Sequence, residues 1–541
     1  MGSEMCIRDR LCIADTVGVF QVESRAQMNF LPRMRPRTFY DLVIEVAIIR
    51  PGPIQGDMVH PYIKRRRGEE PVVFPSKALE PVLGKTLGVP LFQEQAMQIA
   101  SVAAGFTPSE ADQLRRALGT FRGDGTVQNF RARFIQGCLD NGYDLNFAEA
   151  VFRQLEGFSG YGFPESHAAS FALLVYASSW IKCHHPEIFC CAILNSQPLG
   201  FYAPAQLIRD ARQHNVEILP ICVERSYWDN MLEPVGNGQL AVRLGFRQIK
   251  GFKEEDGQWL SLARGNGYRS IDAIWRRAGL GRPALSKLAA ADAFATYDLS
   301  RREALWQVKG LGGDKPLPLF EQTGEGLPYI PSDLPDMSLK EEVFADYVAT
   351  RLSLRAHPVE LLTDEIGRRI RNSAIRDTED RTWVEVCGLV ITRQRPGTAS
   401  GVIFITLEDE SGTANIVVWP SSFEQYRKIV MTGRLIKVSG RLQREGIVTH
   451  IIANKIRNLS YLLDTLGNSE DYGDHIDPTR QNPDEARNPI PLKDKPMTDK
   501  SARPPLPDQH YGTVSSYYNA SSGARHPREQ AKKLFPSRDF H

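Results

Sequence analysis

The sequence has few cysteines and no paired cysteine motif. Its 8 cysteines are scattered over 541 residues, without a C-x-x-C pair or a regular spacing. Disulfide frameworks need such spacing and an oxidising compartment. This cysteine usage therefore indicates a reducing, cytoplasmic location.

Long hydrophobic runs are also scarce. No signal peptide is recognisable, and the longest apolar run, residues 168–181, is interrupted by three serines. A membrane-spanning helix needs about 20 consecutive apolar residues, so this run is too short. We expect it to be a buried helix, and we expect no membrane association.

Charge of one sign is not in excess. The 66 Lys and Arg residues nearly balance the 64 Asp and Glu residues, which leaves a net charge of +2 at pH 7. Any binding of nucleic acid must then come from local patches, because the chain has no strong overall field. The chain is long enough for several domains, each with its own core.

The amino-terminal part, residues 11–235, has the pattern of helices joined by tight turns. One helix is expected to begin at Pro108, with Thr107 or Ser109 as its cap, and another at Pro164. Both expectations follow from the preference for proline in the first helical turn and for a hydroxyl side chain just before it.

The remaining sequence changes character three times. Residues 236–310 hold two helix–glycine turn–helix patterns, and residues 311–380 hold a proline- and glycine-rich linker followed by helices. Residues 381–460 contain five short β-rich runs with a helical segment between the third and fourth, which predicts a small closed barrel of the OB type. Residues 461–541 lose apolar periodicity and are expected to be a disordered polar tail. The expected fold class is multi-domain α+β, mostly helical before the barrel.

Two motifs that suggest ligands are weakened by their spacing. Gly84-Lys85-Thr86 resembles the end of a phosphate-binding P-loop, but Leu79 stands where a glycine is required. The segment from Cys183 to Cys191 offers thiols and imidazoles for zinc, but its adjacent pairs diverge around a proline. Buried cysteines and helix-end histidines are the favoured interpretation there.

Arginines and glycines gather at two further places. Arg115 and Arg116 are adjacent near a helix end, in a segment with further arginines, and form either a solvated face or a phosphate clamp. A glycine-rich loop ends at the helix that begins at Pro164, where free N–H groups favour an anion and Ser166 and His167 add donors. Glu165 opposes an anion, and the glycines alternatively serve only tight packing. The basic run Lys64–Arg67 is open to the same two interpretations.

Several ordered motifs together resemble one family. They are "ADTVGVFQVESRAQM", "VAIIRPGPIQGDMVHPYIKRR", "LGVPLFQEQAMQIASVAAGFT", "EADQLRRALG", "GYGFPESHAASFALLVYASSW" and "ILNSQPLGFYAPAQLIRDARQH". The sequence resembles the bacterial C-family DNA polymerases, the alpha subunit of polymerase III and its relatives. "GFPESHAASFA" and "SQPLGFY" resemble the error-prone, damage-inducible branch. The resemblance covers residues 11–459 and the final "SRDFH".

The resemblance implies roles for the regions found above. Residues 11–235 would be the polymerase fingers, residues 236–310 a tandem helix-hairpin-helix region that holds duplex DNA, and residues 381–460 an OB domain that binds nucleic acid. The fingers would hold the triphosphate of the incoming nucleotide and lie near the nascent base pair. The implied nucleotide-binding residues are Arg115, Arg116, Tyr161, Gly162, Phe163, Ser166 and His167.

The hairpins and the barrel supply the candidate DNA-binding residues. Lys253 stands where the first hairpin motif would have its second glycine, which is expected to weaken the turn toward phosphate. The second hairpin keeps both glycines. Basic and aromatic residues of the barrel suit single-stranded nucleic acid, although such aromatics can equally belong to a core. The candidates are Lys250, Lys253, Gly279, Gly281, Arg282, Arg393, Arg395, Phe404, Trp419, Lys437 and Arg441.

The resemblance also implies an activity, a cofactor and partners. The activity would be template-directed DNA synthesis across damaged template, with Mg²⁺ in the full-length enzyme. The family's metal-binding palm aspartates and its PHP domain precede the segment matched here, and residues 1–10 look foreign to it. We therefore expect no catalytic residue or metal site in this chain, and no polymerisation by the chain alone.

Expected partners are primer-template DNA, deoxynucleoside triphosphates, a Y-family-like accessory mutasome subunit with its companion protein, and through them the sliding clamp. Pro316–Phe320 is only a partial clamp-binding peptide, and a linker is favoured there. The alternative function is a non-catalytic DNA-binding module in which hairpins and barrel tether partners. A tRNA-synthetase anticodon-binding part, suggested by the barrel alone, is disfavoured by the fingers-like region.

Overall fold

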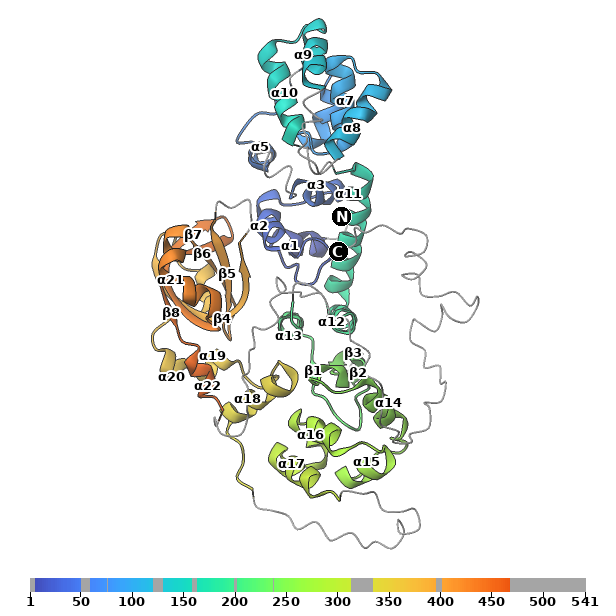
Figure 1. Ribbon diagram of the computed structural model, residues 1–541, viewed down its shortest axis with the longest axis vertical. Helices are drawn as coiled ribbons and strands as arrows, with labels where there is room; N and C mark the ends of the chain where they lie inside the picture. The colour runs from blue at the N-terminus through green and yellow to red at the C-terminus, as the bar shows by residue number, and fades with distance from the viewer. Residues whose placement is uncertain are drawn as a thin grey trace, which may run out of the picture. The chain divides into compact units, whose positions relative to one another are not determined.

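The computed structural model describes residues 5–49, 59–74, 76–119, 130–157, 163–198, 202–236, 238–312, 334–395 and 401–467. Its amino-terminal part is helical, and one core of buried apolar side chains unites these helices (Figure 1). Its described α-helices begin with α1 (Met5–Cys12), α2 (Arg25–Met34), α3 (Phe39–Ile48), α5 (Val59–Arg67), α6 (Glu80–Leu83) and α7 (Gln93–Ala104). They are followed by α8 (Pro108–Gly119), α9 (Arg131–Asp140), α10 (Leu145–Gly157), α11 (Glu165–His184), α12 (Pro186–Asn195) and α13 (Pro204–Gln213).

Local capping explains where several of these helices begin. The Ser24 hydroxyl accepts from the backbone of α2, and Thr38 forms a capping box at the start of α3. Thr107 and Glu110 cap α8 in the same way, since the Glu110 carboxylate accepts from the Thr107 backbone at 2.8 Å. The predicted helix starts at Pro108 and Pro164 agree with the structure.

Helix α11 packs through small side chains against α3 and also contacts α1 (Figure 1). Its buried residues follow each other at intervals of three or four: Ala168, Ala172, Val175, Ser179 and Lys182. The expectation that residues 168–181 form a fully buried helix is wrong, because Leu173 is 58% exposed and Leu174 49%. The helix is apolar on every side, but among the described residues only one side of it has neighbours that bury it.

A small three-stranded sheet follows α13, where helices alone were expected. Strand β1 (Ile218–Leu219) pairs in parallel with β3 (Gln239–Arg243), and β2 (Met231–Gly236) pairs antiparallel with β3. Strand β2 is difficult to recognise because none of its six residues is buried. A strand without a buried face lacks the alternating pattern that identifies strands in sequence.

The hairpin region forms a second core with this sheet. Its helices are α14 (Glu254–Leu262), α15 (Ile271–Arg277), α16 (Arg282–Ala290) and α17 (Arg301–Gly310). The helices expected within residues 311–380, after the linker, are α18 (Leu339–Thr350), α19 (Pro358–Leu361) and α20 (Thr363–Ile366). Arg351 ends α18 in a left-handed conformation, and Pro358 can only begin a new helix.

Five strands close into a barrel in the order β4-β5-β6-β8-β7. They are β4 (Trp383–Gln394), β5 (Ile403–Glu408), β6 (Thr413–Val418), β7 (Leu435–Glu445) and β8 (Val448–Asn458). Helix α21 (Pro420–Thr432) connects β6 to β7, as predicted, and α22 (Tyr461–Asp464) follows β8. At Gly440 a Cβ would lie 2.1 Å from the carbonyl oxygen of Ile452, so only glycine allows this approach of β7 to β8.

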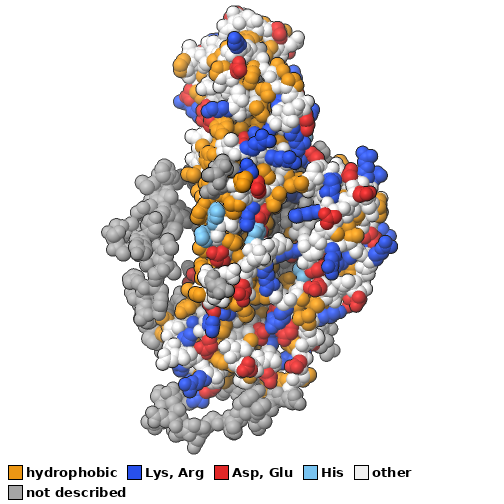
Figure 2. Space-filling view, turned by 180° about the vertical axis from the view of Figure 1, so that it is seen from behind, with side chains coloured by type: hydrophobic (Ala, Val, Ile, Leu, Met, Phe, Trp, Pro, Cys, Tyr) orange, Lys and Arg blue, Asp and Glu red, His pale blue; other side chains and the backbone are white. Residues whose placement is uncertain are grey.

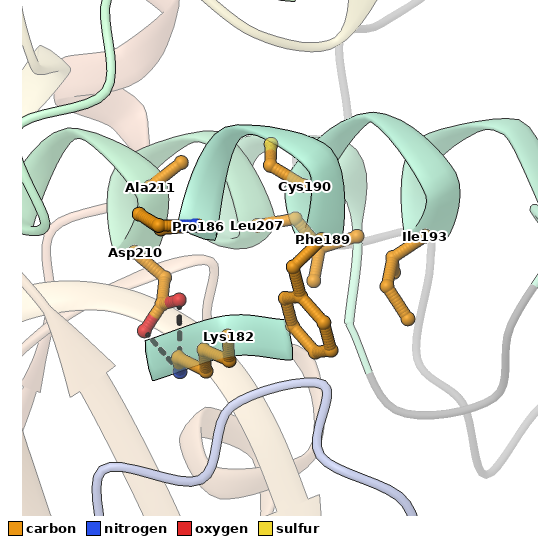
Figure 3. Close-up of a pocket in the computed structure, with 8 residues that line it drawn as sticks. All are labelled: Lys182, Pro186, Phe189, Cys190, Ile193, Leu207, Asp210 and Ala211. Atoms are coloured by element: carbon orange, nitrogen blue, oxygen red, sulfur yellow. Dashed lines mark hydrogen bonds and ion pairs between the residues drawn. The ribbon is translucent and has the colours of Figure 1, made fainter. Parts of the chain in front are cut away.

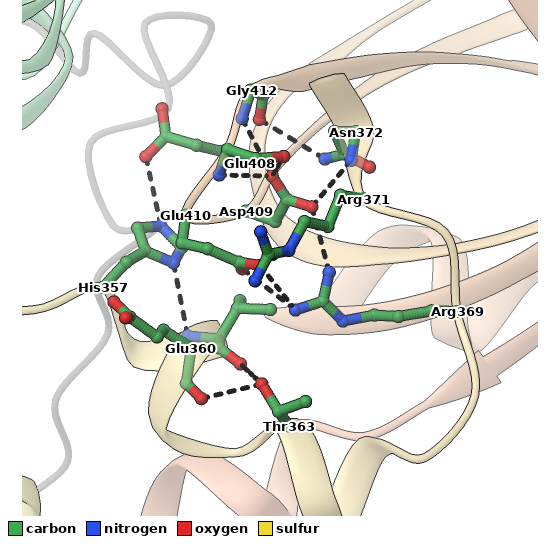
Figure 4. Close-up of polar contacts among 12 residues, drawn as sticks. His357, Glu360, Thr363, Arg369, Arg371, Asn372, Glu408, Asp409, Glu410 and Gly412 are labelled. Carbon is green, nitrogen blue, oxygen red and sulfur yellow. Dashed lines mark hydrogen bonds and ion pairs between the residues drawn. The ribbon is translucent and has the colours of Figure 1, made fainter. Parts of the chain in front are cut away.

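The barrel is joined to the segment before it by buried charged groups (Figure 4). The Arg369 guanidinium contacts Asp409 at 3.1 Å and Glu410 at 2.9 Å, and Asp409 also accepts from the backbone N–H of Asn372. Glu408 faces His357 at 3.4 Å. Buried charges that are paired in this way fix the position of the segment on the barrel.

The predicted fold class is confirmed: helical fingers-like region, hairpin region and five-stranded OB barrel occur in that order. The predicted tail from residue 468 onward lies outside the described residues, as does Pro316–Phe320. In the part of the chain that is described, no helix has both the length and the apolar character needed to cross a membrane.

Candidate nucleotide and nucleic-acid interface

The two arginines predicted to hold phosphate share one carboxylate. Arg115 donates to Asp112 through Nε at 3.0 Å and Nη2 at 2.7 Å, and Arg116 donates through Nε at 2.9 Å. The hydrogen bond from Arg115 contributes most to lowering the pKa of Asp112. The side chain of Arg116 is 74% exposed and that of Arg115 is 39% exposed. The group therefore presents two forked donors and one net positive charge to solvent.

The start of α11 is already occupied by acidic side chains. Glu94 accepts from the backbone N–H of Glu165 at 3.0 Å, and the Tyr40 hydroxyl donates to the Glu165 carboxylate at 2.6 Å. Phe163 is buried, with its ring edge-on to His167 at 5.1 Å, whereas Ser166 and His167 are exposed. Tyr161 and Gly162 lie outside the described residues. Acidic side chains thus already occupy part of the N-terminus of α11, since the backbone N–H of Glu165 is bound by Glu94.

Helices α7 and α8 form a hairpin that connects the arginine pair of α8 with the segment at the start of α11. The helices pack together and are joined by a short turn in which Gly105 has φ +63°. Because the helices run in opposite directions, the arginine end of α8 returns toward the first turn of α7. There Gln93 donates its backbone N–H to the carbonyl of Phe163 at 3.1 Å. Arg115, Arg116 and Phe163 therefore lie at the same end of this hairpin.

The two helix-hairpin-helix turns have matching backbones. Gly251 and Gly279 have φ values of +67° and +65°, and the apolar residues that follow them, Phe252 and Leu280, are buried. Lys250, Lys253 and Arg282 are exposed at these turns. Gly281 and Lys253 are the N-caps of α16 and α14, so each turn ends at a helix N-terminus that faces outward. The backbone donors at each turn suit a phosphate, but Glu254, Glu255 and Asp256 in the first turn of α14 oppose one at the first hairpin, whereas α16 has no acidic residue there.

The DNA-binding residues predicted on the barrel differ in their exposure and in their contacts. Trp419 is 49% exposed at the start of α21, and Arg395 lies over the ring of Phe423 at 5.6 Å. Arg441 is exposed and donates from Nε to the carbonyl of Arg381. Arg393 donates to the carbonyl of Gly433.

Phe404 lies under the guanidinium of Arg25 at 5.1 Å, so its ring is already covered on one side. Of these six barrel candidates, only Lys437 is buried. Its ammonium donates to the carbonyls of Ile366 at 3.3 Å and Arg368 at 2.6 Å and faces Glu385 at 3.4 Å. These contacts give Lys437 a structural role and remove its ammonium from the surface of the barrel.

Sequence reasoning missed Trp383, which is 56% exposed and stands opposite Arg441 in the pairing of β4 with β7. An exposed tryptophan beside an arginine is the kind of pair that stacks a base and holds its phosphate. The signal in the sequence that could have identified Trp383 is its position at the start of the first β-rich run.

A buried charged cluster, also missed, links α11 to α13 (Figure 3). The ammonium of Lys182 lies 3.1 Å from Asp15 and 2.9 Å from Asp210, and His214 lies 2.7 Å from Asp15. Hydrogen bonding to Asp15 raises the pKa of His214, whereas burial raises the pKa of Asp210. Asp210 and His214 are four residues apart on one helix, but Asp15 and Lys182 come from distant segments, so no local pattern could reveal the whole cluster.

Neither side-chain cluster with metal-ligand spacing among the described residues fits magnesium. In the cluster of Asp15, Asp210 and His214, the Lys182 ammonium sits between the two carboxylates and takes the place of a cation. The other cluster, Cys6, Cys183 and His184, offers two thiols and an imidazole, whereas magnesium binds oxygen ligands. Cys190 and Cys191, considered with zinc in the sequence, are buried in α12.

Comparisons with known proteins agree with the order of these regions. Residues 6–142 match the bacterial DNA polymerase III alpha subunit finger domain, residues 215–304 a helix-hairpin-helix motif, and residues 384–459 an OB-fold nucleic acid binding domain. A protein named error-prone DNA polymerase from Ruegeria pomeroyi is 57% identical over 536 residues, which are 98% of this chain and 46% of that protein. Error-prone DNA polymerase 1 of Rhizobium meliloti is 52% identical over 488 residues, 85% of this chain and 44% of that protein.

The chain therefore spans a little under half the length of the curated relatives it matches. Among solved structures, asparaginyl-tRNA synthetase from Pyrococcus horikoshii matches 17% of this chain and 23% of that protein, at 21% identity and a TM-score of 0.15. A likeness this low supports no conclusion about fold or function.

Proposed function

The chain belongs to the bacterial C-family DNA polymerases, with relatives named error-prone DNA polymerase, and from this premise we propose that it is the nucleotide-gripping and DNA-holding part of such an enzyme. Residues 11–235 would act as fingers, 236–310 as the duplex-binding hairpins and 381–460 as a nucleic-acid-binding barrel. The enzyme would join deoxynucleotides under the direction of a template.

The observation that carries this proposal is the pair of exposed guanidinium groups on α8, within the segment that matches the finger domain. Transfer of a nucleotide develops negative charge on the departing pyrophosphate, and fixed positive donors there stabilise the transition state. Arginine keeps its charge at any working pH and offers a fork that fits phosphate oxygens. Arg115 and Arg116 would serve this role, with Phe163, Ser166, His167, Tyr161 and Gly162 near the base.

Magnesium, which the DNA polymerase family generally uses, would add charge neutralisation at the same phosphates when bound. The contribution proposed for this chain is independent of that ion, because binding and orientation of the triphosphate rest on Arg115 and Arg116. The prediction that this chain alone does not extend a primer remains a prediction, and a primer-extension assay tests it.

Binding of DNA would be shared between the hairpins and the barrel. The outward-facing turns at Gly251 and Gly279 can accept the phosphates of a duplex, with Lys250, Lys253 and Arg282 adding charge. Such contacts do not depend on base sequence and weaken as salt increases. The exposed pairs on the barrel, with Trp383, Arg441 and Trp419, would stack and hold a single strand.

The name of the relatives also suggests the biological setting. We propose that the enzyme copies damaged template, with an accessory mutasome subunit and, through it, the sliding clamp as partners. The support is the relatives' name, error-prone DNA polymerase, together with the motifs "GFPESHAASFA" and "SQPLGFY".

Titration with deoxynucleoside triphosphate distinguishes this function from a purely tethering module. The variant Arg115→Ala/Arg116→Ala should weaken binding by on the order of tenfold or more, since hydrogen bonds between charged groups contribute about 1.5–3 kcal/mol each. Arg153→Ala, which removes an exposed arginine of α10, is the matched control. A chain that binds no nucleotide but still binds DNA would support the tethering function instead.

A further inference from the structure

Helix α2 lies against the strands of the barrel that are best placed to bind nucleic acid. Arg25 donates to the side chain of Asn415 on β6 at 3.1 Å, and its guanidinium covers the ring of Phe404 on β5. Arg33, two turns later, pairs with Glu445 at the end of β7 at 2.5 Å. In OB folds the face of the second and third strands, here β5 and β6, carries oligonucleotides.

The contact between α2 and the barrel has more hydrogen-bond donors than acceptors. Nε and Nη1 of Arg25, Nε of Arg33 and Nδ1 of His450 on β8 are buried, and none has a hydrogen-bond partner in the described structure. Burial, followed by the positive charges of Arg25 and Arg33, lowers the pKa of His450 to about 4. Burial likewise lowers the pKa of Arg25 to about 10. A buried donor without a partner is costly, so an anion at this place would be stabilised.

Exposed basic residues continue from this contact. Arg35 and Arg37 follow α2, and Lys64 is on α5, whose Arg66 donates to the carbonyl of Met34 at 2.7 Å and so joins the two helices. Arg35, Arg37 and Lys64 make no ion pair with any described carboxylate. Lys and Arg side chains are seen gathered below the uppermost helices in the view of Figure 2.

A polar cleft gives access to the contact. It has a volume of about 540 Å³, and its walls include Arg25 and Asn29 of α2, Thr406 of β5 and Asn415 of β6. A chain of phosphates could therefore reach Arg25 from solvent. The charge of the cleft is mixed, because Asp15, Glu23, Asp210 and Glu408 line it together with Arg25, Arg209 and Arg376. The exposed basic residues after α2 and on α5 lie outside this lining, so an anion would be favoured at the Arg25 side of the cleft.

We propose that Arg25, Arg33 and His450, together with the α2–α5 patch of Arg35, Arg37 and Lys64, bind the phosphates of a single-stranded nucleic acid that lies on the barrel. The inference rests on the proposed DNA binding by the barrel and adds a helical wall to that site. Single strands are favoured over duplex because the cleft is bounded by α2 on one side and by β5 and β6 on the other. Glu445 marks the end of the site, since its carboxylate already holds Arg33.

The salt dependence of oligothymidylate binding tests the patch. For single strands the slope of log K against log salt is about −0.7 per phosphate contact, so Arg35→Gln/Lys64→Gln should reduce its size by about 1.4. Both side chains are exposed, so the fold should be retained. Arg153→Gln/Lys309→Gln removes two exposed charges on α10 and α17 and should leave the slope unchanged. Equal slopes for the patch variant and the control variant would overturn the proposal.

The pKa of His450 provides a second, independent measurement of binding at the same site. An anion held beside it should oppose the influence of the two arginines, so the pKa of His450 measured by NMR should rise when the oligonucleotide binds. No change in that pKa would overturn the part of the proposal that concerns Arg25, Arg33 and His450. Binding of a duplex of the same length is measured for comparison. Stronger binding of the duplex to the patch would contradict the proposal that a single strand is the ligand.

The same titrations separate this proposal from the more general one. If the wild-type chain binds no oligonucleotide, the proposed DNA binding fails, and this inference fails with it. If Trp419→Ala/Arg441→Gln weakens binding while the patch variant behaves as the wild type, only the helical wall is rejected.

Discussion

Lys253 and Gly281 occupy the same backbone position in the two hairpin turns. Lys253 has φ −89° and ψ 140°, and Gly281 has φ −73° and ψ 160°, each as the N-cap of the helix that follows. Lys253 was expected to weaken the first turn because it stands in place of a glycine. Backbone strain is not a reason for such weakening, because this position has a negative φ that any residue adopts. The position that needs glycine is two residues earlier, and both turns keep it. Lys253 adds a positive charge at the proposed site of phosphate binding without backbone strain.

This relationship predicts opposite outcomes for two neighbouring substitutions. Gly279→Ala should lower the free energy of unfolding by about 1–2 kcal/mol, because an L-residue in the left-handed region carries that cost. Gly281→Ala should cost less, since its φ is negative and its Cβ would meet only the Cδ of Pro283 at 3.6 Å, which leaves only the preference for glycine over alanine at an N-cap. Urea unfolding of the two variants measures the difference. Equal losses would show that the turn does not depend on the sign of φ.

The parts of the fold that sequence predicted are those with local signals. The start of α8 follows from Pro108 and its cap, and the five barrel strands follow from short β-rich runs separated by glycine turns. Strand β2 was missed because it buries no side chain, and the exposed side of α11 because an apolar helix does not show which face is covered. The number of packing partners is a tertiary property that periodicity does not contain.

The candidate site was predictable to a similar extent. The adjacent arginines on one helix indicated either a phosphate clamp or a solvated face. Asp112, three and four residues before them, has the spacing of a helical ion pair and could have been recognised as their partner. The contact of Arg25 with Phe404 joins residues from different domains. No spacing rule predicts such a pair, because it depends on how α2 packs on the barrel.

Asp112 is expected to compete with a bound triphosphate. Its lowered pKa keeps it ionised at neutral pH, so it holds both guanidinium groups that phosphate would otherwise contact. Asp112→Asn should therefore raise triphosphate affinity by at most about fivefold, since exposed ion pairs are screened by solvent and contribute little. Isothermal titration of the wild type and the variant measures this. Weaker binding by the variant would mean that Asp112 positions the arginines for the ligand.

The buried cluster around His214 predicts a dependence of stability on pH. The pKa of His214 is raised above 6.5 by hydrogen bonding to Asp15, so the ionised imidazole stabilises the folded state. This contribution is fully present below pH 6.5 and is lost as pH rises through the folded-state pKa. His214→Gln should thus be destabilised most at low pH, with the difference from the wild type shrinking toward alkaline pH. Urea unfolding over about pH 6 to pH 9 checks the trend, which a constant difference would contradict.

Lys437 and Arg441, on the same strand β7, should respond to substitution in different ways. Lys437→Met would leave the carbonyls of Ile366 and Arg368 without their buried donor, so we expect a loss of about 2 kcal/mol in unfolding free energy. Arg441→Gln alters an exposed side chain and should change stability by less than about 0.5 kcal/mol. Its effect should instead appear as weaker oligothymidylate binding, with the salt slope reduced by about 0.7.

The two variants are each other's control, because each removes one positive charge from β7. A Lys437→Met protein that stays folded under the assay conditions should bind oligothymidylate with the wild-type salt slope, since the buried ammonium is not available to phosphate. If its slope falls as much as that of Arg441→Gln, Lys437 must leave its carbonyl partners when nucleic acid binds. The strand β7 would then rearrange on binding, and Lys437 would return to the interface from which its burial excludes it.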